Sequence, residues 1–133
     1  KRKLDAGAVR GVTQFFFEAD VFLRFRDRLS KAGVSAPITV GVMPVTNVGG
    51  AKRMAAMWGA SVPAWFESLF DGLDKDPQTR QLVAAATAAE LCTRLSNEGV
   101  ADFHFYTLNR ADLVLAICRM LGVKTPAPIE AAA

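Results

Sequence analysis

The seven residues GVTQFFF, from Gly11 to Phe17, decide the fold class of this chain. β-branched and aromatic side chains follow one another here, whereas a strand with one face in water alternates apolar and polar residues. A short, continuous apolar run of this kind is typical of a strand in a parallel sheet covered by helices. Gln14 is a polar amide in the middle of this run.

Two further segments have the same character, ITVGVMP at 38–44 and DFHFYTL at 102–108. Helical patterns fill the connections between the three predicted strands and follow the last one. Strands that alternate with helices build a parallel sheet with right-handed crossovers, so the predicted class is α/β.

The helical segments are marked by apolar spacing and by capping residues. The first covers 21–32, with Val21, Phe22, Phe25, Leu29 and Ala32 on one face and Gly33 at its end. Later helices are predicted over 51–58, from about Pro63, and after Asp76-Pro77, where Ala84, Ala88, Leu91 and Leu95 share a side. In the last helix we expect Asn109 to be the cap, Asp112 to be the third residue, Leu113, Ile117, Met120 and Leu121 to be buried, and Gly122 to mark the end.

Composition and charge narrow the class of protein. The chain has 133 residues, of which 51% are hydrophobic and 22% charged, as in one soluble globular domain. The longest apolar run, Val83–Cys92, is far shorter than the roughly 20 residues that cross a bilayer. The net charge of +3 is scattered apart from Lys1-Arg2-Lys3, so we expect a cytoplasmic protein that binds neither membranes nor nucleic acid. Cys92 and Cys118 are expected to be buried free thiols.

Three strands are too few for a closed sheet. A (β/α)8 TIM barrel needs about 250 residues, so a chain of this length would supply only part of one. The first residues of the chain also resemble the last turns of a helix. We therefore expect the chain to be part of a longer protein. We expect one structured unit over 1–123 and a disordered tail over 124–133.

Few side chains point to chemistry on their own. Gln14 needs a hydrogen-bond partner if it is buried, and either a ligand or a neighbouring backbone would serve. Glu18 is expected to favour the start of the following helix, and His104 to be a hydrogen-bonded core residue. The turn at 47–50 resembles an anion-binding turn but lacks a phosphate-loop spacing. We assign no catalytic residue and no metal ligand.

Several short sequence motifs, taken in their order along the chain, are more specific than any single side chain. KRKLDAGA at 1–8, TQFFF at 13–17, GVMPVTN at 41–47, VPAW at 62–65 and GVADFHFYTLNR at 99–110 closely resemble the second half of bacterial methylenetetrahydrofolate reductases. The likeness runs from Lys1 to about Val123. It implies that the three strands are the sixth to eighth of a barrel.

The resemblance implies a flavin enzyme. Members of this family hold FAD and use NAD(P)H to reduce 5,10-methylenetetrahydrofolate to 5-methyltetrahydrofolate, with nicotinamide and folate taking turns in one site. By matched motif, Gln14 would hydrogen-bond both ligands, Leu108 and Arg110 would line the same pocket, and Arg2 and Lys3 would contact FAD. A homo-oligomer is expected, and the choice between NADH and NADPH stays open.

The chain departs from the family pattern at Met54, where the family often has a phenylalanine that stacks on the ligand. Gly50 also stands where a polar side chain can occur. The family's proton-donating glutamate and flavin-tuning aspartate match no position in this chain. In the family's sequences, both residues come before the position that matches Lys1. We therefore expect the chain alone to be inactive. Two alternatives remain from the residues themselves, a non-catalytic α/β binding module and another flavin-dependent barrel that oxidises an amine such as proline.

Overall fold

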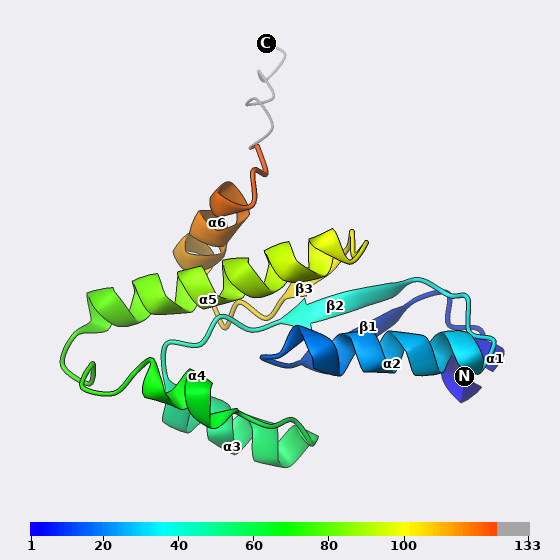
Figure 1. Cartoon of the computed structure of the whole chain (residues 1–133), viewed down its shortest axis with the longest axis horizontal. Helices are drawn as coiled ribbons and strands as arrows, with labels where there is room; N and C mark the ends of the chain where they lie inside the picture. Colours follow the sequence, from blue (N-terminus) through cyan, green and yellow to red (C-terminus); the bar gives the residue numbers. More distant parts are fainter. Residues whose placement is uncertain (125–133) are drawn as a thin grey trace, which may run out of the picture.

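A computed structural model describes residues 1–124 and shows one parallel sheet in the order β1-β2-β3 (Figure 1). The strands are β1 (Gly11–Phe15), β2 (Ile38–Val42) and β3 (Phe103–Phe105). The α/β class and the parallel direction are therefore confirmed. Within the described residues the sheet has two unpaired edges, one on β1 and one on β3.

Each strand is shorter than its apolar run. The predicted ends at 17, 44 and 108 were wrong, since the ladders stop at 15, 42 and 105. Phe17, Met43 and Val45 are nevertheless buried, because they pack into a side-chain cluster beyond the end of the sheet. An apolar run therefore marked burial correctly but overestimated the length of backbone pairing.

Six helices accompany the strands in the described part of the chain: α1 (Arg2–Asp5), α2 (Ala19–Lys31), α3 (Val48–Trp58), α4 (Ala64–Ser68), α5 (Pro77–Asn97) and α6 (Ala111–Met120). The Asp76 cap is confirmed, because its side chain accepts a hydrogen bond from the Thr79 amide at 2.9 Å. The hydroxyl and amide of Thr79 hold the pKa of Asp76 below its ordinary value. Gly33 directly follows Ala32, the C-cap of α2, and has a positive φ of 69°, as expected at a helix end.

Three helix starts were predicted wrongly. α2 begins at Ala19 rather than at 21. α3 begins at Val48 rather than at 51, because the Asn47 side chain accepts a hydrogen bond from the Gly50 amide at 2.9 Å and caps the helix earlier. α6 is capped by Arg110 and not by Asn109, which has a left-handed φ of 62° outside the helix. Asp112 is consequently the second helical residue and not the third.

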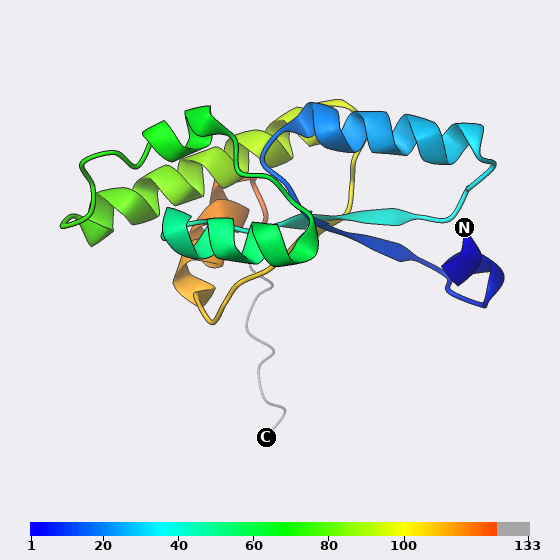
Figure 2. The same cartoon turned by 90° about the horizontal axis from the view of Figure 1, so that it is seen from below.

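The main hydrophobic cluster lies between one face of the sheet and three helices. Val40 and Val42 of β2 pack there with Phe22 of α2, and α5 and α6 complete it (Figures 1 and 2). α5 contributes the predicted side Ala84, Ala88, Leu91 and Leu95, and α6 contributes Leu113 and Ile117. The expected burial of Val21, Ala32 and Met120 was wrong, because all three are exposed: Val21 borders an open cavity, Ala32 follows the end of α2, and Met120 is the last residue of α6.

A second hydrophobic cluster covers the carboxyl end of the sheet. Phe15 and Phe17 meet Met43 and Val45 there, and Ala51 and Ala55 of α3 with Phe66 of α4 close over them. Phe17 and Phe66 are in close ring contact, with centroids 4.3 Å apart. The two helices between β2 and α5 therefore hold the loop after β2 in place.

The two cysteines are free, as expected, but only Cys92 is fully buried, and Cys118 is half-buried. Burial in the main cluster raises the pKa of Cys92 to about 12, and Cys118 adds to the shift in the same direction.

Among residues 1–124 no helix is long and apolar enough to span a membrane. Of the tail predicted over 124–133, residues 125–133 lie outside the described part of the chain.

Candidate functional site

The carboxyl edge of the sheet is the place where parallel α/β proteins gather functional groups. Gln14 lies near the end of β1, Met54 lies on α3 after β2, and Leu108 and Arg110 lie in the loop after β3. Because the three strands run in the same direction, all four candidates belong to this edge of the sheet. We call these residues the carboxyl-edge site.

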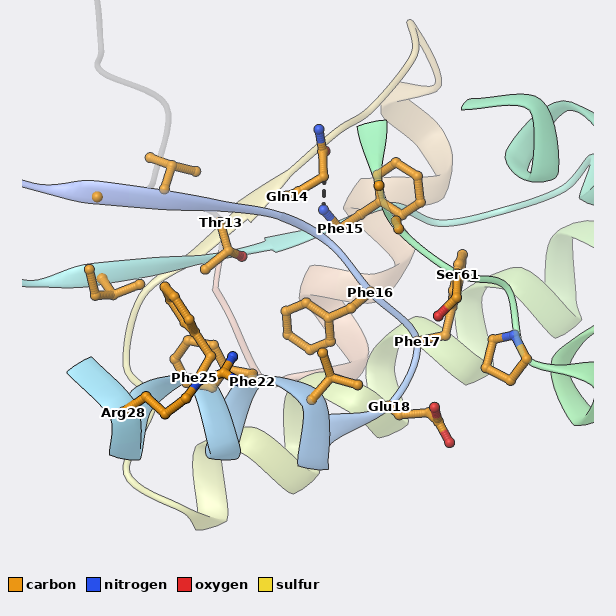
Figure 3. A pocket seen from close by; sticks show the side chains of 17 residues that line it. Thr13, Gln14, Phe15, Phe16, Phe17, Glu18, Phe22, Phe25, Arg28 and Ser61 are labelled. Carbon is orange, nitrogen blue, oxygen red and sulfur yellow. Dashed lines mark hydrogen bonds between the residues drawn. The ribbon is translucent and has the colours of Figure 1, made fainter. Parts of the chain in front are cut away.

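Gln14 is exposed, which corrects the expectation that it is buried in the strand. Its side-chain oxygen accepts a hydrogen bond from the Phe15 amide at 3.2 Å, and its side chain points away from Phe16, Phe22 and Phe25 (Figure 3). The sequence argument failed because it treated both faces of β1 as covered, whereas Val12 on β1 is also 53% exposed. Gln14 is thus free to offer its amide to a bound molecule.

The other carboxyl-edge residues differ in exposure. Leu108 is 58% exposed and has a left-handed φ of 48°, and Arg110 is exposed at the start of α6. Met54 is partly buried against the second cluster. Leu108 and Arg110 therefore offer an exposed apolar side chain and an exposed cation in the loop after β3, whereas Met54 is less exposed.

Arg2 and Lys3 do not lie with the carboxyl-edge residues. They are exposed on α1, which precedes β1 and lies at the opposite end of that strand (Figures 1 and 2). The two side chains are adjacent cations, and their charge suits phosphate oxygens. A single ligand that reached both groups would have to be long.

His104 is not a core residue, contrary to expectation. It is exposed, and its ring meets Tyr106 edge to face with centroids 4.8 Å apart. The reason is that alternate residues of β3 face opposite ways, so that Phe103 and Phe105 take the side packed by helices. Residues 1–124 contain no cluster of three or more His, Cys, Asp or Glu side chains that suits a metal ion.

A cavity of about 470 Å³ lies beside the unpaired edge of β1. Its lining is mostly apolar and comes from residues 11–18, from the side of α2 that includes Phe22 and Phe25, and from the loop after α3 (Figure 3). Phe16 and Phe22 stack within it with ring centroids 5.9 Å apart. An apolar space along an unpaired strand is what a missing neighbour of the sheet leaves.

Sequence reasoning missed three residues that shape the site, namely Thr13, Gly41 and Tyr106. The Tyr106 hydroxyl donates to the Thr13 carbonyl at 3.0 Å, and the Gly41 amide donates to the Thr13 hydroxyl at 2.9 Å. A glycine inside a strand often marks a close approach of other groups. Gly41 in the run ITVGV was therefore the available signal.

Comparison with known proteins places these observations in a family. The sequence profile described as methylenetetrahydrofolate reductase matches residues 1–122. The 5,10-methylenetetrahydrofolate reductase of Escherichia coli (strain K12) is 53% identical over 124 residues, which are 93% of this chain and 42% of that protein. The enzyme of the same name from Buchnera aphidicola subsp. Acyrthosiphon pisum is 42% identical over 123 residues, 92% of this chain and 42% of that protein.

A plant relative is more distant. Methylenetetrahydrofolate reductase (NADH) 1 of Arabidopsis thaliana is 32% identical over 92% of this chain, which is 21% of its own length. The chain thus spans about two fifths of the length of its bacterial relatives. The match over nearly every described residue shows that the chain belongs to the methylenetetrahydrofolate reductase family.

Proposed function

We propose that this chain is the C-terminal part of a FAD-dependent reductase that converts 5,10-methylenetetrahydrofolate to 5-methyltetrahydrofolate with NAD(P)H. The observation that carries the proposal is the exposed Gln14 amide at the carboxyl edge, in a chain of the reductase family. The names of the bacterial relatives support the reaction, and the 42% share of their length supports a longer parent protein. In that parent we expect residues 1–123 to form one structural unit and the protein to be a cytoplasmic homo-oligomer.

The proposed architecture of the parent is a (β/α)8 barrel of which this chain supplies about three β/α units. The unpaired edges of β1 and β3 and the apolar cavity beside β1 support it. Buried strands of a parallel sheet require neighbours on both sides, and the carboxyl ends of barrel strands form the active site. In this arrangement the cavity beside β1 is filled by protein and is not the ligand site.

The carboxyl-edge site would bind folate and nicotinamide in turn. The Gln14 amide has both a donor and an acceptor, which suits the amide and ring edges that both molecules carry. Leu108 and Met54 would supply apolar contact, and the Arg110 guanidinium would face an anionic part of the ligand. Methionine at position 54 has no flat aromatic face, so we expect this wall to contact the ligand without ring stacking.

Arg2 and Lys3 would bind the phosphate side of FAD. Their charge and exposure fit a dinucleotide, and their distance along β1 from Gln14 fits an extended cofactor. When bound, FAD supplies the two-electron redox chemistry that links the two substrates. The residues of this chain would bind and orient FAD, folate and nicotinamide. The acid and flavin-tuning roles are left to residues of the parent outside this chain.

The test is to express the coding sequence together with its upstream part and to purify the product. We expect a flavin absorbance spectrum and NADH oxidation with a quinone acceptor. Gln14→Ala should lower turnover with methylenetetrahydrofolate by about tenfold or more, as expected for losing hydrogen bonds to the ligand. Gln81→Ala, at an exposed position on α5, is the matched control and should leave turnover unchanged.

Arg2→Ala with Lys3→Ala should lower the flavin content of the purified protein. An unmodified protein without flavin and without activity would overturn the proposed function. Full folate turnover in Gln14→Ala would contradict the proposed role of Gln14. Oxidation of an amine such as proline, without folate turnover in the unmodified protein, would instead favour a different flavin barrel.

A further inference from the structure

β1 contains an irregularity at the two residues Thr13 and Gln14. Val12 pairs with Thr39 and Phe15 pairs with Gly41, so β1 advances three residues where β2 advances two. One extra residue in one strand is a β-bulge, which is rare in parallel sheets and re-aims the side chains beside it. The bulge therefore places an irregular backbone directly at Gln14.

The effect on side-chain direction is visible in Figure 3. Gln14 and Phe15 are neighbours in sequence, yet both lie on the side of β1 away from α2, whereas Thr13 and Phe16 lie toward α2. In a regular strand adjacent side chains would point to opposite faces. The extra residue thus lets β1 bury Phe15 in the second cluster while it holds Gln14 exposed at its side.

Two hydrogen bonds from other strands hold this bulge. The Gly41 amide of β2 donates to the Thr13 hydroxyl at 2.9 Å, in place of a carbonyl. The Tyr106 hydroxyl donates to the Thr13 carbonyl at 3.0 Å, across the width of β2. Tyr106 itself is fixed by its amide, which donates to the Val42 carbonyl at 2.9 Å. The hydroxyl oxygen and the carbonyl oxygen of Thr13 thus each accept a hydrogen bond from outside β1.

Gly41 makes the crossing possible. A Cβ atom at this position would lie 2.8 Å from a ring carbon of Tyr106 and would collide with the Thr13 carbonyl oxygen. The Tyr106 ring therefore passes over Gly41 of β2 and reaches Thr13 of β1. The arrangement depends on Thr13 of β1, on the backbone of Gly41 in β2 and on Tyr106, the residue directly after β3.

We propose that Tyr106 is a positioning residue, which acts through the Thr13 carbonyl to hold the bulge that directs Gln14 toward the ligand. The proposal rests on the proposed function of Gln14 and adds the device that sets its direction. Tyr106 needs no contact with the ligand in this role. Thr13 is its partner, and its hydroxyl holds the same bulge from the side of β2.

The experiment is a double-mutant cycle in the full-length protein. Tyr106→Phe keeps the ring over Gly41 and removes only the hydroxyl. It should lower kcat/KM for both methylenetetrahydrofolate and NADH by about three- to tenfold, because one hydrogen bond that orients Gln14 is lost. In a Gln14→Ala background the same substitution should change kcat/KM by less than about twofold, since coupled residues are non-additive. Flavin content should stay unchanged throughout.

Thr13→Val is the second variant and should show the same non-additive pattern with Gln14→Ala. It tests the bulge independently if Tyr106→Phe folds poorly. Thr93→Val is the matched control, because the Thr93 hydroxyl bonds the Ala89 carbonyl within α5 and lies away from the sheet. It should leave kcat/KM unchanged. Equal losses from Tyr106→Phe in both backgrounds, or no loss in the unmodified background, would overturn the positioning role.

A crystal structure of Tyr106→Phe supplies a readout that does not depend on turnover. We expect the pairing of Phe15 with Gly41 to shift or the Gln14 side chain to leave its present direction. An unchanged bulge and an unchanged Gln14 would overturn the proposal even if activity fell. A protein that binds no flavin while this variant loses the bulge would contradict the proposed function and leave the structural role standing.

Discussion

At the scale of single residues, Gly41 is the described glycine at which an added Cβ atom would meet its neighbours most closely. It carries no side chain, and its Cα faces both the Tyr106 ring and the backbone of β1. Backbone atoms cannot move aside in the way that the end of a flexible side chain can. The constraint on Gly41 is therefore steric and does not depend on any bound ligand.

Gly41→Ala should lower the free energy of unfolding of the full-length protein by about 1–3 kcal/mol, the usual range for an overpacked core. Denaturant titration measures this loss. Gly49→Ala is the matched control, because its Cβ would meet no atom closer than 3.6 Å in α3, and it should leave stability equal or slightly higher. Equal stability of Gly41→Ala and the unmodified protein would show that β1 and Tyr106 can yield.

The direction of Gln14 could not be predicted from sequence for a related reason. The strand was recognisable from its apolar residues, but the bulge depends on Gly41 in the next strand and on Tyr106, which is 93 residues after Thr13. Likewise Asn109 is a good capping residue by type, yet left-handed backbone at Leu108 and Asn109 moves the N-cap of α6 to Arg110, so the helix begins at Ala111. Residue type predicted the presence of each element, and long-range contacts decided its details.

At the scale of elements, α5 contributes more buried residues to the main hydrophobic cluster than any other helix or strand. Its buried side was readable from the spacing of small and apolar residues, because that spacing matches the helical period. Cys92 lies on this side and is fully buried. Its thiol is therefore a sensor of whether α5 remains packed.

The burial of Cys92 predicts how stability depends on pH. The pKa of Cys92 is about 12 in the folded chain against an ordinary value of 9.0, so the unfolded chain releases the thiol proton first. Stability from this group is constant below pH 9.0 and falls between 9.0 and about 12, by at most about 1.4 kcal/mol per pH unit. Denaturant titrations of the full-length protein from pH 8 upward measure this slope.

Cys92→Ala should remove this contribution to the slope, whereas Cys118→Ala should keep most of it, because Cys118 is only the smaller cause of the shift. A thiol reagent at pH 8 should modify half-buried Cys118 first and Cys92 only on unfolding. Rapid labelling of Cys92 in the folded protein would contradict the packing of α5 described above.

At the scale of the whole molecule, the unpaired edge of β1 dominates the behaviour of the isolated chain. Val12 on this strand is 53% exposed, and the apolar cavity lies directly beside it. Unpaired strands with apolar surroundings template the pairing of other chains. The number of strands was readable from sequence, and the chain covers 42% of the length of a bacterial relative.

The isolated 133-residue chain should therefore associate with itself as its concentration rises. Val12→Lys should reduce this association, since a charge on an edge strand opposes pairing. Leu82→Lys is the matched control, because Leu82 is 70% exposed on α5 and away from the edge. Sedimentation velocity measures the self-association of the unmodified chain and of both variants. A chain that stays monomeric at all concentrations would argue that β1 needs no neighbour.

The bond between Tyr106 and Thr13 also has a consequence for the order of folding. It joins residues 93 apart and crosses β2, so it can form only when all three strands have been assembled. Contacts of such long sequence separation form late, because the chain between them must first be ordered. On the proposed role of Tyr106, we expect a molecule that has paired only β1 and β2 to hold the bulge through the Thr13 hydroxyl alone. Gln14 would then acquire its final direction when Tyr106 arrives.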